Sequence, residues 1–480
     1  MKSIIKCLCV NTFLSSILLF ASVMLYAQEQ NKYISYWQGI IKNGGQELTI
    51  NLKVFKEKEG KLNAVMESVE QGTGDLPTSD FYLGTDSLRF KVPLVNGIYS
   101  GKIVSDSNII RGFWKQGPFT VELNFKKVDE IEKPKRPQLP QKPYPYNEEE
   151  VSFQNKQANI TLAGSFTFPK SGSSFPAVVL ISGSGPQDRD ETIFNHKPFL
   201  VIADYLTRNG IAVLRFDDRG VGKSQGNYSA ATTAELAQDA LSAVEYLKSR
   251  KEVNPKKIGL IGHSEGGLIA SMIASSSNDI SFIVLLASPG LPGKDILLMQ
   301  QKLIAQAQGV DEKTIEENFR INEKMYDIVL SEPDSDKAVE KLNKVLNDYV
   351  NTLPSEKKGM VQFSEEGRKQ MIKVIMSPWF RFFLKYDPRP ALESIFVPVL
   401  ALNGSKDLQV SAKANLTEIE KALTSGGNKH FEVKELPGLN HLFQNCDTGS
   451  PTEYAKIEET FSPAALKIIG DWILKVTNNK

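Results

Sequence analysis

Ser264 stands in a sequence context that favours nucleophilic chemistry. It is the central residue of Gly262-His-Ser-Glu-Gly266, which follows the apolar run 258–261 and precedes a helix-like stretch. A G-x-S-x-G motif between a strand and a helix is typical of a sharp turn that presents a serine hydroxyl. The flanking glycines carry no Cβ, so the strand and the helix can approach each other closely. The motif predicts that Ser264 attacks an acyl carbonyl.

A serine hydroxyl is a weak nucleophile without an adjacent base, so we expect one of the four histidines to act on it. His441 follows the strand-like run 431–436 through a short loop, and open parallel sheets place their sites beyond the carboxyl ends of strands. His441 is therefore the predicted base. His263 is expected to pack or orient beneath the serine turn, and His430 to lie on the surface. His196, in a loop before a helix, is a candidate for substrate contact.

The base needs a carboxylate that orients it. Asp407 follows the strand-like run 398–402 through a short loop, again at a carboxyl end. The order Ser264, Asp407, His441 is the order of nucleophile, acid and base along α/β-hydrolase chains. The weaker alternatives for the carboxylate are Glu393, Glu435 and Asp447.

Negative charge that develops on the substrate oxygen calls for two preorganised N–H donors. One is predicted to be the backbone N–H of Glu265, directly after the nucleophile. The other is expected in the glycine-rich loop 182–186, which follows the apolar run 177–181. Ser184 is the predicted donor there, with Gly185 as the alternative.

Composition and motifs argue against several other kinds of protein. The formal net charge of +1 does not favour a nucleic-acid binder. The run 220–224 ends like a phosphate-binding loop, but Asp217 stands where that motif requires glycine. There is no H-x-x-x-H pair for a metal. We expect no cofactor and no metal.

The first 27 residues read as a signal peptide. Lys2 and Lys6 precede the apolar stretch 13–24, and Ala27 is a small residue suited to cleavage. An uncleaved membrane anchor is the alternative. After cleavage only Cys446 remains, so no intramolecular disulfide can form. We expect a protein exported to a bacterial envelope, either periplasmic or secreted, without a stable membrane span.

Two segments precede the catalytic motifs. Residues 28–128 contain short alternating runs separated by glycine turns, which predicts a small antiparallel β-sandwich or barrel. Trp37 and Trp114 are expected in its core rather than as ligand platforms. Residues 129–150 hold five prolines and predict a stiff, extended linker.

Residues 151–480 show another pattern, in which apolar runs alternate with amphipathic stretches. This pattern predicts parallel strands covered by helices on both faces. About residues 292–390 lack strong strands and predict a helical cap. Its apolar side chains are expected mainly in the core of the cap, with an acyl pocket as the alternative role; they are Met360, Met371, Met376, Trp379, Phe380, Phe382 and Phe383.

The chain from residue 151 onward resembles the α/β-hydrolase superfamily. The segment 216–224 resembles the D-x-R-G-x-G-x-S motif common there. The segments 182–190 and 262–267 are similar to those of bacterial esterases grouped with the serine aminopeptidase-like hydrolases. The resemblance implies an eight-stranded, mostly parallel sheet with a lid, and triad roles for Ser264, Asp407 and His441. Many relatives have His-Gly at the oxyanion loop, where this chain has Ser182-Gly183.

We therefore expect an exported serine esterase that works through an acyl-enzyme on a small-molecule ester or amide. One alternative is an aminopeptidase or prolyl peptidase of the same fold, for which Glu316 and Glu317 are candidates to bind an amino terminus. An alternative of another class is a catalytically inactive envelope-binding protein. The N-terminal domain, which lies outside the resemblance, is a candidate for contact with a partner or an envelope polymer.

Overall fold

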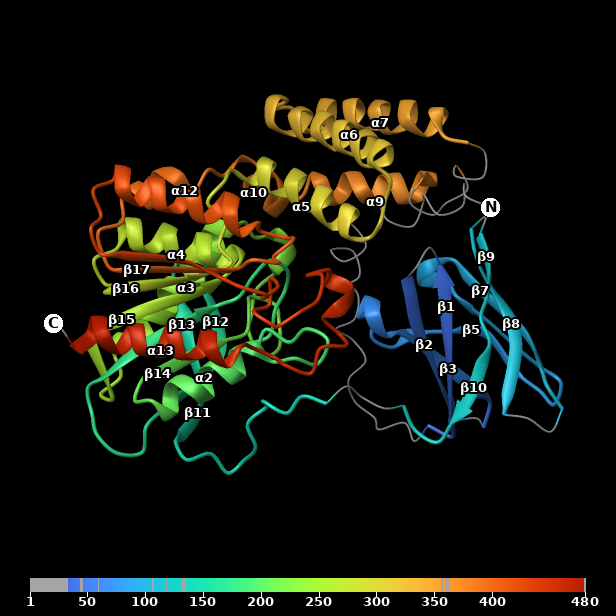
Figure 1. Ribbon diagram of the computed structural model, residues 1–480, viewed down its shortest axis with the longest axis horizontal. Coiled ribbons are helices and arrows are strands. Elements are labelled where there is room, and N and C mark those ends of the chain that lie inside the picture. Colours follow the sequence, from blue (N-terminus) through green and yellow to red (C-terminus); the bar gives the residue numbers. More distant parts are fainter. Residues whose placement is uncertain are drawn as a thin grey trace.

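The computed structural model describes residues 33–43, 46–58, 60–105, 108–117, 119–131, 135–354, 358 and 363–478. The predicted signal peptide and Met360 lie outside the described residues. The described part forms an N-terminal antiparallel sheet and a larger unit in which helices cover a second sheet (Figure 1). In the part of the chain that the structure describes, no helix combines the length and the apolar character needed to cross a membrane.

The N-terminal sheet is antiparallel throughout, in the order β4-β3-β2-β1-β10-β8-β7-β6-β5, with β9 paired to β8. Strand β5 contacts β3, so the two ends of the sheet meet as in a barrel. Trp37 and Trp114 are buried in the resulting core, which confirms their predicted place. The elements are β1 (Ser35–Asn43), β2 (Gln46–Lys56), β3 (Leu62–Ser68), η1 (Val69–Gln71), β4 (Leu76–Pro77), β5 (Ser79–Leu83), β6 (Ser87–Val92), η2 (Pro93–Val95), β7 (Gly97–Ile103), β8 (Ile109–Gln116), β9 (Phe119–Glu122) and β10 (Phe125–Val128).

Part of the proline-rich segment is bound to the larger unit. Arg136 donates hydrogen bonds to the backbone carbonyls of Phe194 and Ala455, each at 2.9 Å, and Gln138 donates to Phe461 O at 2.7 Å. The residues from 147 onward already belong to strand β11. The guanidinium offers several donors at once, so carbonyls of the larger unit fix the segment along its surface.

The second sheet has eight strands in the order β11-β12-β14-β13-β15-β16-β17-β18. Strands β11 and β12 pair antiparallel at one edge, and β13 to β18 run parallel, which confirms the predicted mostly parallel sheet. The strands are β11 (Asn147–Asn155), β12 (Ile160–Phe168), β13 (Phe175–Ile181), β14 (Ala212–Phe216), β15 (Val253–His263), β16 (Phe282–Leu286), β17 (Val399–Gly404) and β18 (Phe431–Leu436).

Helices cover both faces of this sheet, because its central strands are apolar on both sides. Helices α2 and α13 pack on one face, and α3, α4, α11 and α12 on the other (Figure 1). The helices are α2 (Pro198–Arg208), α3 (Thr233–Lys248), α4 (Glu265–Ser276), α11 (Arg389–Glu393), α12 (Ala412–Ser425) and α13 (Pro463–Asn478), with short turns η3 (Tyr228–Ala230) and η5 (Pro451–Glu453).

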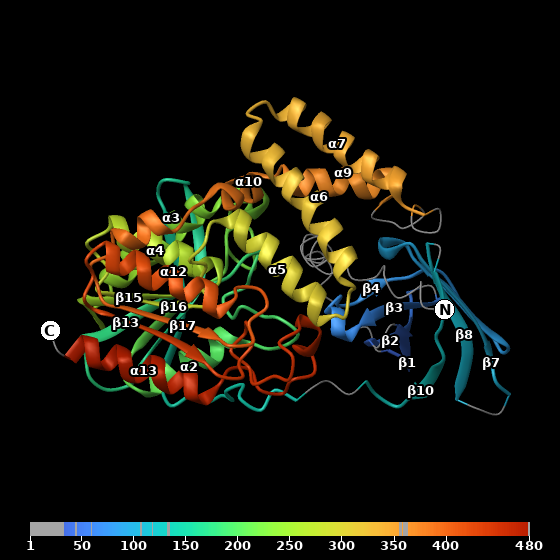
Figure 2. The same cartoon turned by 45° about the horizontal axis from the view of Figure 1, so that its top comes forward.

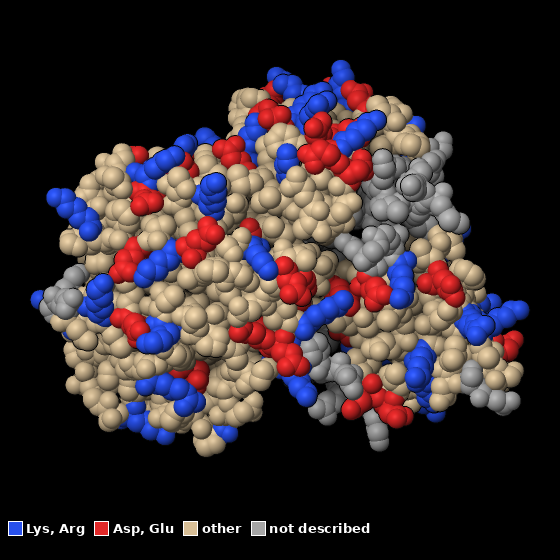
Figure 3. Space-filling model, in the orientation of Figure 1, with Lys and Arg blue, Asp and Glu red and all other residues tan. Residues whose placement is uncertain are grey.

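The cap lies between β16 and β17 in the chain and has its own apolar core. Its helices are α5 (Gly293–Ala307), α6 (Glu312–Ser331), α7 (Ser335–Thr352), α9 (Glu365–Ile375) and α10 (Pro378–Lys385). The Ser377 side chain caps the start of helix α10, and Pro378 is its first residue. Both views place the cap and the β domain at the same end of the second sheet (Figures 1 and 2). Acidic and basic side chains alternate over the visible face (Figure 3).

Candidate active site

Ser264 occupies a tight turn between β15 and α4. Its φ of 52° is in the left-handed region, which a serine adopts only when the surrounding structure compels it. A Cβ on Gly262 would lie 2.0 Å from Gly266 O, and one on Gly266 would lie 2.1 Å from Ile181 O. Both positions therefore exclude any side chain. The turn has the geometry that the motif predicts, with a half-buried serine at its apex.

His441 and Asp407 form a buried pair. His441 Nδ1 lies 2.7 Å from Asp407 Oδ2. The other carboxylate oxygen accepts the backbone N–H groups of Gln409 and Val410, each at 2.8 Å. The carboxylate is thus held by three donors, and it can orient the imidazole as an acid–base group requires. The alternative carboxylates Glu393, Glu435 and Asp447 are all exposed.

His263, the residue before Ser264 in the chain, contacts His441. The ring of His263, the neighbour of Ser264, lies 4.8 Å from the ring of His441. Within the described residues, the hydrogen bonds of Ser264 are made by its backbone: its N–H donates to Leu286 O, and its carbonyl accepts from Gly267. Catalytic hydrogen bonds often tighten only when substrate binds. The ring contact of His263 thus places the loop of His441 next to the serine turn.

The loop 182–186, called the oxyanion loop below, follows β13 and lies beside Ser264. Two of its N–H groups are engaged: Gly183 donates to Glu191 Oε1 at 2.7 Å, and Gly185 donates to Tyr228 Oη at 2.9 Å. The engagement of Gly185 favours Ser184 as the donor to a substrate oxygen. Ser184 is exposed.

Asp218 holds the oxyanion loop through two hydrogen bonds, and the sequence motifs did not predict these contacts. It accepts hydrogen bonds from Ser182 Oγ at 3.1 Å and from Gln187 N at 2.9 Å. Burial raises the pKa of this carboxyl group well above its usual range, although both hydrogen bonds oppose the shift. The neighbouring Asp217 binds Arg189 at 2.8 Å. The D-x-R-G-like segment thus supports the site structurally.

Glu265 joins the serine turn to the cap. Its buried carboxylate accepts hydrogen bonds from Trp379 Nε1 at 2.8 and 2.9 Å and from Thr233 Oγ1 at 2.6 Å. Burial raises the pKa of Glu265, and hydrogen bonds from Thr233, Trp379 and Ser184 oppose the shift. The sequence placed Trp379 in the cap, but nothing in it indicated this contact between α10 and α4.

The remaining histidines take separate positions. His196 is buried, with Nδ1 2.9 Å from Thr460 Oγ1 and Nε2 3.0 Å from Tyr454 O. Burial lowers its pKa to about 4. The alternative role of His196 in substrate contact is therefore wrong, because both of its nitrogens are occupied within the protein. His430 is exposed, as expected.

Most of the cap's apolar residues that were candidates for an acyl pocket pack in or against the cap core. Phe380 and Phe383 are buried in the cap core, and Met371, Met376 and Trp379 pack against it. Phe382 stacks on Tyr386. Core packing is thus the main role of these side chains, as expected.

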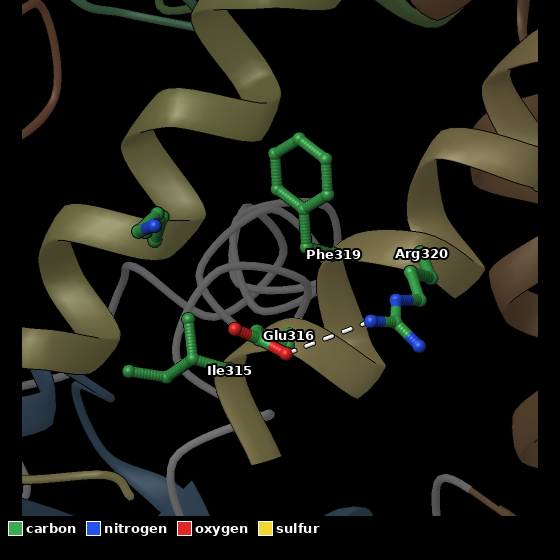
Figure 4. A pocket seen from close by; sticks show the side chains of 5 residues that line it. Ile315, Glu316, Phe319 and Arg320 are labelled. Carbon is green, nitrogen blue, oxygen red and sulfur yellow. Dashed lines mark ion pairs between the residues drawn. The ribbon is translucent and has the colours of Figure 1, made fainter. Parts of the chain in front are cut away.

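A surface hollow on the cap lies between α5 and α6 (Figure 4). Its lining comprises Lys302, Ile315, Glu316, Phe319 and Arg320, and it contains none of the candidate catalytic residues. Glu316 pairs with Arg320 at 3.6 Å, and Glu317 with Lys313 at 4.0 Å. Both carboxylates, candidates for binding an amino terminus, therefore face cations of their own helix.

The described residues include no group of three or more histidine, cysteine, aspartate or glutamate side chains that could hold a metal ion. In the phosphate-loop-like segment, a Cβ on Gly222 would lie 2.5 Å from Asp217 Oδ2. Ser224 Oγ donates to Asp217 O at 2.7 Å. The segment is a closed structural turn.

The chain is similar to several known hydrolases. Esterase EstD of Thermotoga maritima is 29% identical over 307 residues, which are 64% of this chain and 64% of EstD, so the match spans less than two thirds of that relative. Among solved structures, esterase Pf2001 of Pyrococcus furiosus has a TM-score of 0.43 at 17% identity, over 72% of this chain and 98% of that one. Est1E from Butyrivibrio proteoclasticus, solved with ferulic acid bound, has a TM-score of 0.39 at 15% identity, over 68% and 99%.

A family model covers much of the second unit. Residues 197–445 match the family described as serine aminopeptidase, S33. The match begins just before α2 and ends after His441, so it includes the serine turn, the cap and the histidine–aspartate pair. Because it covers more than half of the 480 residues, the chain belongs to the serine aminopeptidase S33 family, and its fold is that of the α/β-hydrolases.

Proposed function

We propose that this hydrolase is an exported serine esterase that cleaves carboxylic esters through a covalent acyl-enzyme. The observation that carries the proposal is the buried pair of His441 and Asp407 at the site where Ser264 is held at φ 52°. Structural turns seldom keep a serine in the left-handed region, whereas catalytic sites store such strain. The similarity to EstD supports the ester as the substrate class.

The proposed reaction has two steps. Ser264 Oγ attacks the acyl carbon while His441 takes its proton, and His441 then protonates the leaving alcohol. Asp407 holds His441 in the tautomer whose Nε2 can accept a proton, since Nδ1 carries the proton shared with Oδ2. The N–H groups of Ser184 and Glu265 stabilise the oxyanion, each contributing about 3 kcal/mol. Water, activated by His441, releases the acid.

Action on free amino termini is the second candidate, because the family description names a serine aminopeptidase. An ammonium group needs an unpaired carboxylate near the nucleophile. The carboxylate of Glu265, nearest to Ser264 in the chain, already accepts hydrogen bonds from Trp379 and Thr233. Glu316 and Glu317 are paired within α6. These contacts favour the ester over the peptide.

The test compares wild type with Ser264→Ala on p-nitrophenyl acetate, on longer acyl esters and on amino-acid and prolyl p-nitroanilides. We expect ester turnover by wild type and its loss in Ser264→Ala. Ser276→Ala, an exposed serine of α4, is the matched control and should retain full activity. Turnover of anilides above esters would favour the peptidase. A fluorophosphonate probe that fails to label wild type would indicate the inactive binding protein instead.

Export belongs to the same proposal. It rests on the basic and apolar residues before Ala27. Expression in a bacterial host should yield a protein that begins at Gln28 and is found outside the cytoplasm, as read by intact mass and fractionation. A protein that keeps residues 1–27 and sediments with membranes would support the anchor.

A further inference from the structure

Glu191 and His263 form a buried pair next to the nucleophile. His263 Nδ1 lies 2.8 Å from Glu191 Oε1, and only 9% and 6% of the two side chains are exposed. The pair reaches two other loops. His263 Nε2 lies 3.0 Å from the backbone carbonyl of His441, and Glu191 Oε1 accepts the N–H of Gly183 at 2.7 Å. One pair thus contacts both the oxyanion loop and the loop of the proposed base.

The contacts of His263 define its protonation. Both ring nitrogens face oxygen atoms that accept hydrogen bonds: a carboxylate oxygen and a backbone carbonyl. A neutral imidazole carries a proton on only one nitrogen, so both bonds form only when the ring is an imidazolium. Burial alone lowers the pKa of His263, but the charge and hydrogen bond of Glu191 outweigh it, and the pKa lies above its ordinary value. The two contacts and the direction of the pKa shift both favour the protonated ring.

Glu191 is also held in a backbone conformation that its residue type disfavours. Its φ is 52°, and Phe194 and Asn195 in the same loop have φ values of 50° and 63°. Such strain is retained where a side chain must be held in one position. Here it holds the Glu191 carboxylate between Gly183 and His263, beside Ser264.

We propose that Glu191 and His263 are positioning residues, which hold the oxyanion loop and the His441 loop in a fixed relation to Ser264. This proposal rests on the proposed function. His263 precedes the nucleophile in the chain, Gly183 precedes the proposed oxyanion donor Ser184, and the His441 carbonyl belongs to the proposed base. One bonded pair therefore sets the distances among three groups that come from β13, β15 and the loop after β18.

The physical effect of losing the pair is on the chemical step. Without Glu191, the half-buried Gly183 N–H and the His263 ring lose their partner, and the loops can move apart. A displacement of about 1 Å at a reacting group can lower the rate about 100-fold. We expect KM to change little, because neither Glu191 nor His263 is proposed to contact the substrate. A lower kcat at nearly constant KM is expected for a positioning role. A loss of folded protein also lowers the apparent kcat at constant KM, but it leaves the rate constant of labelling by excess fluorophosphonate unchanged, so a fall in that rate constant separates the two.

The experiment measures kcat and KM for p-nitrophenyl acetate, and the rate of fluorophosphonate labelling at Ser264, in Glu191→Ala, Glu191→Gln and wild type. We expect kcat and the labelling rate of Glu191→Ala to fall about 10- to 100-fold, with KM within about threefold. Glutamine keeps an oxygen that can accept from Gly183 but lacks the charge that favours the protonated His263 ring, so Glu191→Gln should recover only part of the loss. Thr192→Val is the control in the same loop, since Thr192 bonds Asp188 and not the pair.

The outcomes separate the two proposals. If wild type is labelled and Glu191→Ala reacts as fast as Thr192→Val, the positioning role is wrong and the esterase proposal stands. If wild type is not labelled at Ser264, both are wrong. Should Glu191→Ala not fold, His263→Asn replaces it, because the shorter side chain cannot reach both Glu191 and the His441 carbonyl. The same fall in kcat is then expected, and an unchanged kcat would overturn the proposal.

Discussion

The Nδ1 atom of His441 lies 2.7 Å from Oδ2 of Asp407, and the two residues stand on loops that follow adjacent parallel strands. Strands β17 and β18 are in register from Val399 and Phe431 to Gly404 and Leu436, so both chains leave the sheet at the same edge. The pairing of these residues is therefore a consequence of the sheet. The contact predicts a specific effect on catalysis.

Asp407→Asn should lower kcat about 10³- to 10⁴-fold while the fold is kept. The oxygen of asparagine can keep the N–H groups of Gln409 and Val410, which turns its NH₂ group toward His441 Nδ1. The imidazole then carries its proton on Nε2 and cannot accept one from Ser264. Turnover of p-nitrophenyl acetate and circular dichroism measure the two effects. Asp447→Asn, which changes an exposed alternative carboxylate, is the control. A loss of activity in Asp447→Asn with full activity in Asp407→Asn would show that Asp447 orients His441.

Trp379→Phe should destabilise the protein by about 1–3 kcal/mol, because a buried carboxylate loses a hydrogen-bond donor. Phenylalanine keeps an aromatic ring that can pack on Phe383 but removes the rest of the indole together with its N–H, so the loss combines packing with the hydrogen bond. Urea unfolding measures it. In Glu265→Gln the acceptor is uncharged, and the cost of Trp379→Phe should be smaller in that background. Equal costs in both backgrounds would show that the hydrogen bond to the charged carboxylate contributes nothing.

Acid should destabilise the fold through His196, because burial lowers its pKa to about 4 in the folded state. The unfolded histidine, with a pKa near 6.5, binds a proton first as pH falls. The stabilisation is therefore complete above about pH 6.5 and is lost progressively down to about pH 4, amounting to roughly 3 kcal/mol. His196→Gln should flatten this dependence in urea unfolding between pH 7 and pH 4.5. His430→Gln, an exposed histidine, should leave it unchanged.

Gly72 tests the contact between the β domain and the hydrolase unit. It has φ +60°, and a Cβ there would lie 2.4 Å from the Phe194 ring; nearby, Lys456 Nζ lies 3.3 Å from Glu70. Gly72→Ala should cost about 1–2 kcal/mol for the left-handed backbone, plus the displacement of Phe194. Gly74→Ala is the matched control, with φ +60° and no described atom within 4 Å of its Cβ. The difference between the two in thermal unfolding measures the domain contact, and equal values would show that the contact adds no stability.

The activity of Gly72→Ala and Gly74→Ala shows whether the domain contact affects the candidate active site. Phe194 lies three residues after Glu191, in the loop with the left-handed backbone. We expect Gly72→Ala to lower kcat more than Gly74→Ala does. Equal kcat values would show that displacement of Phe194 stops before Glu191.

The sequence predicted the strands and helices well where the hydrophobic period agreed with the glycine and proline residues that end them. The run at 431–436 forms strand β18 with those bounds, at the edge of the sheet. Helix α10 shows little helical period in the sequence because five apolar or aromatic residues within Pro378–Lys385 leave little polar face. The composition of segment 129–150 predicts an extended chain. It does not indicate the hydrogen bonds of Arg136 with residues far along the chain, which bind the segment to the larger unit.

The sequence by itself determined the chemistry that the protein is proposed to perform. The motif around Ser264 and the positions of Asp407 and His441 after strand-like runs are local signals, and the α/β sheet follows from the alternation of runs. Only the tertiary structure decided the contacts of Glu191, Asp218 and Trp379. Each is a single polar residue whose partners lie 31 or more residues away in the chain, apart from Gly183, eight residues from Glu191. No local period encodes such a pairing, because it depends on where the folded sheet, loops and cap meet.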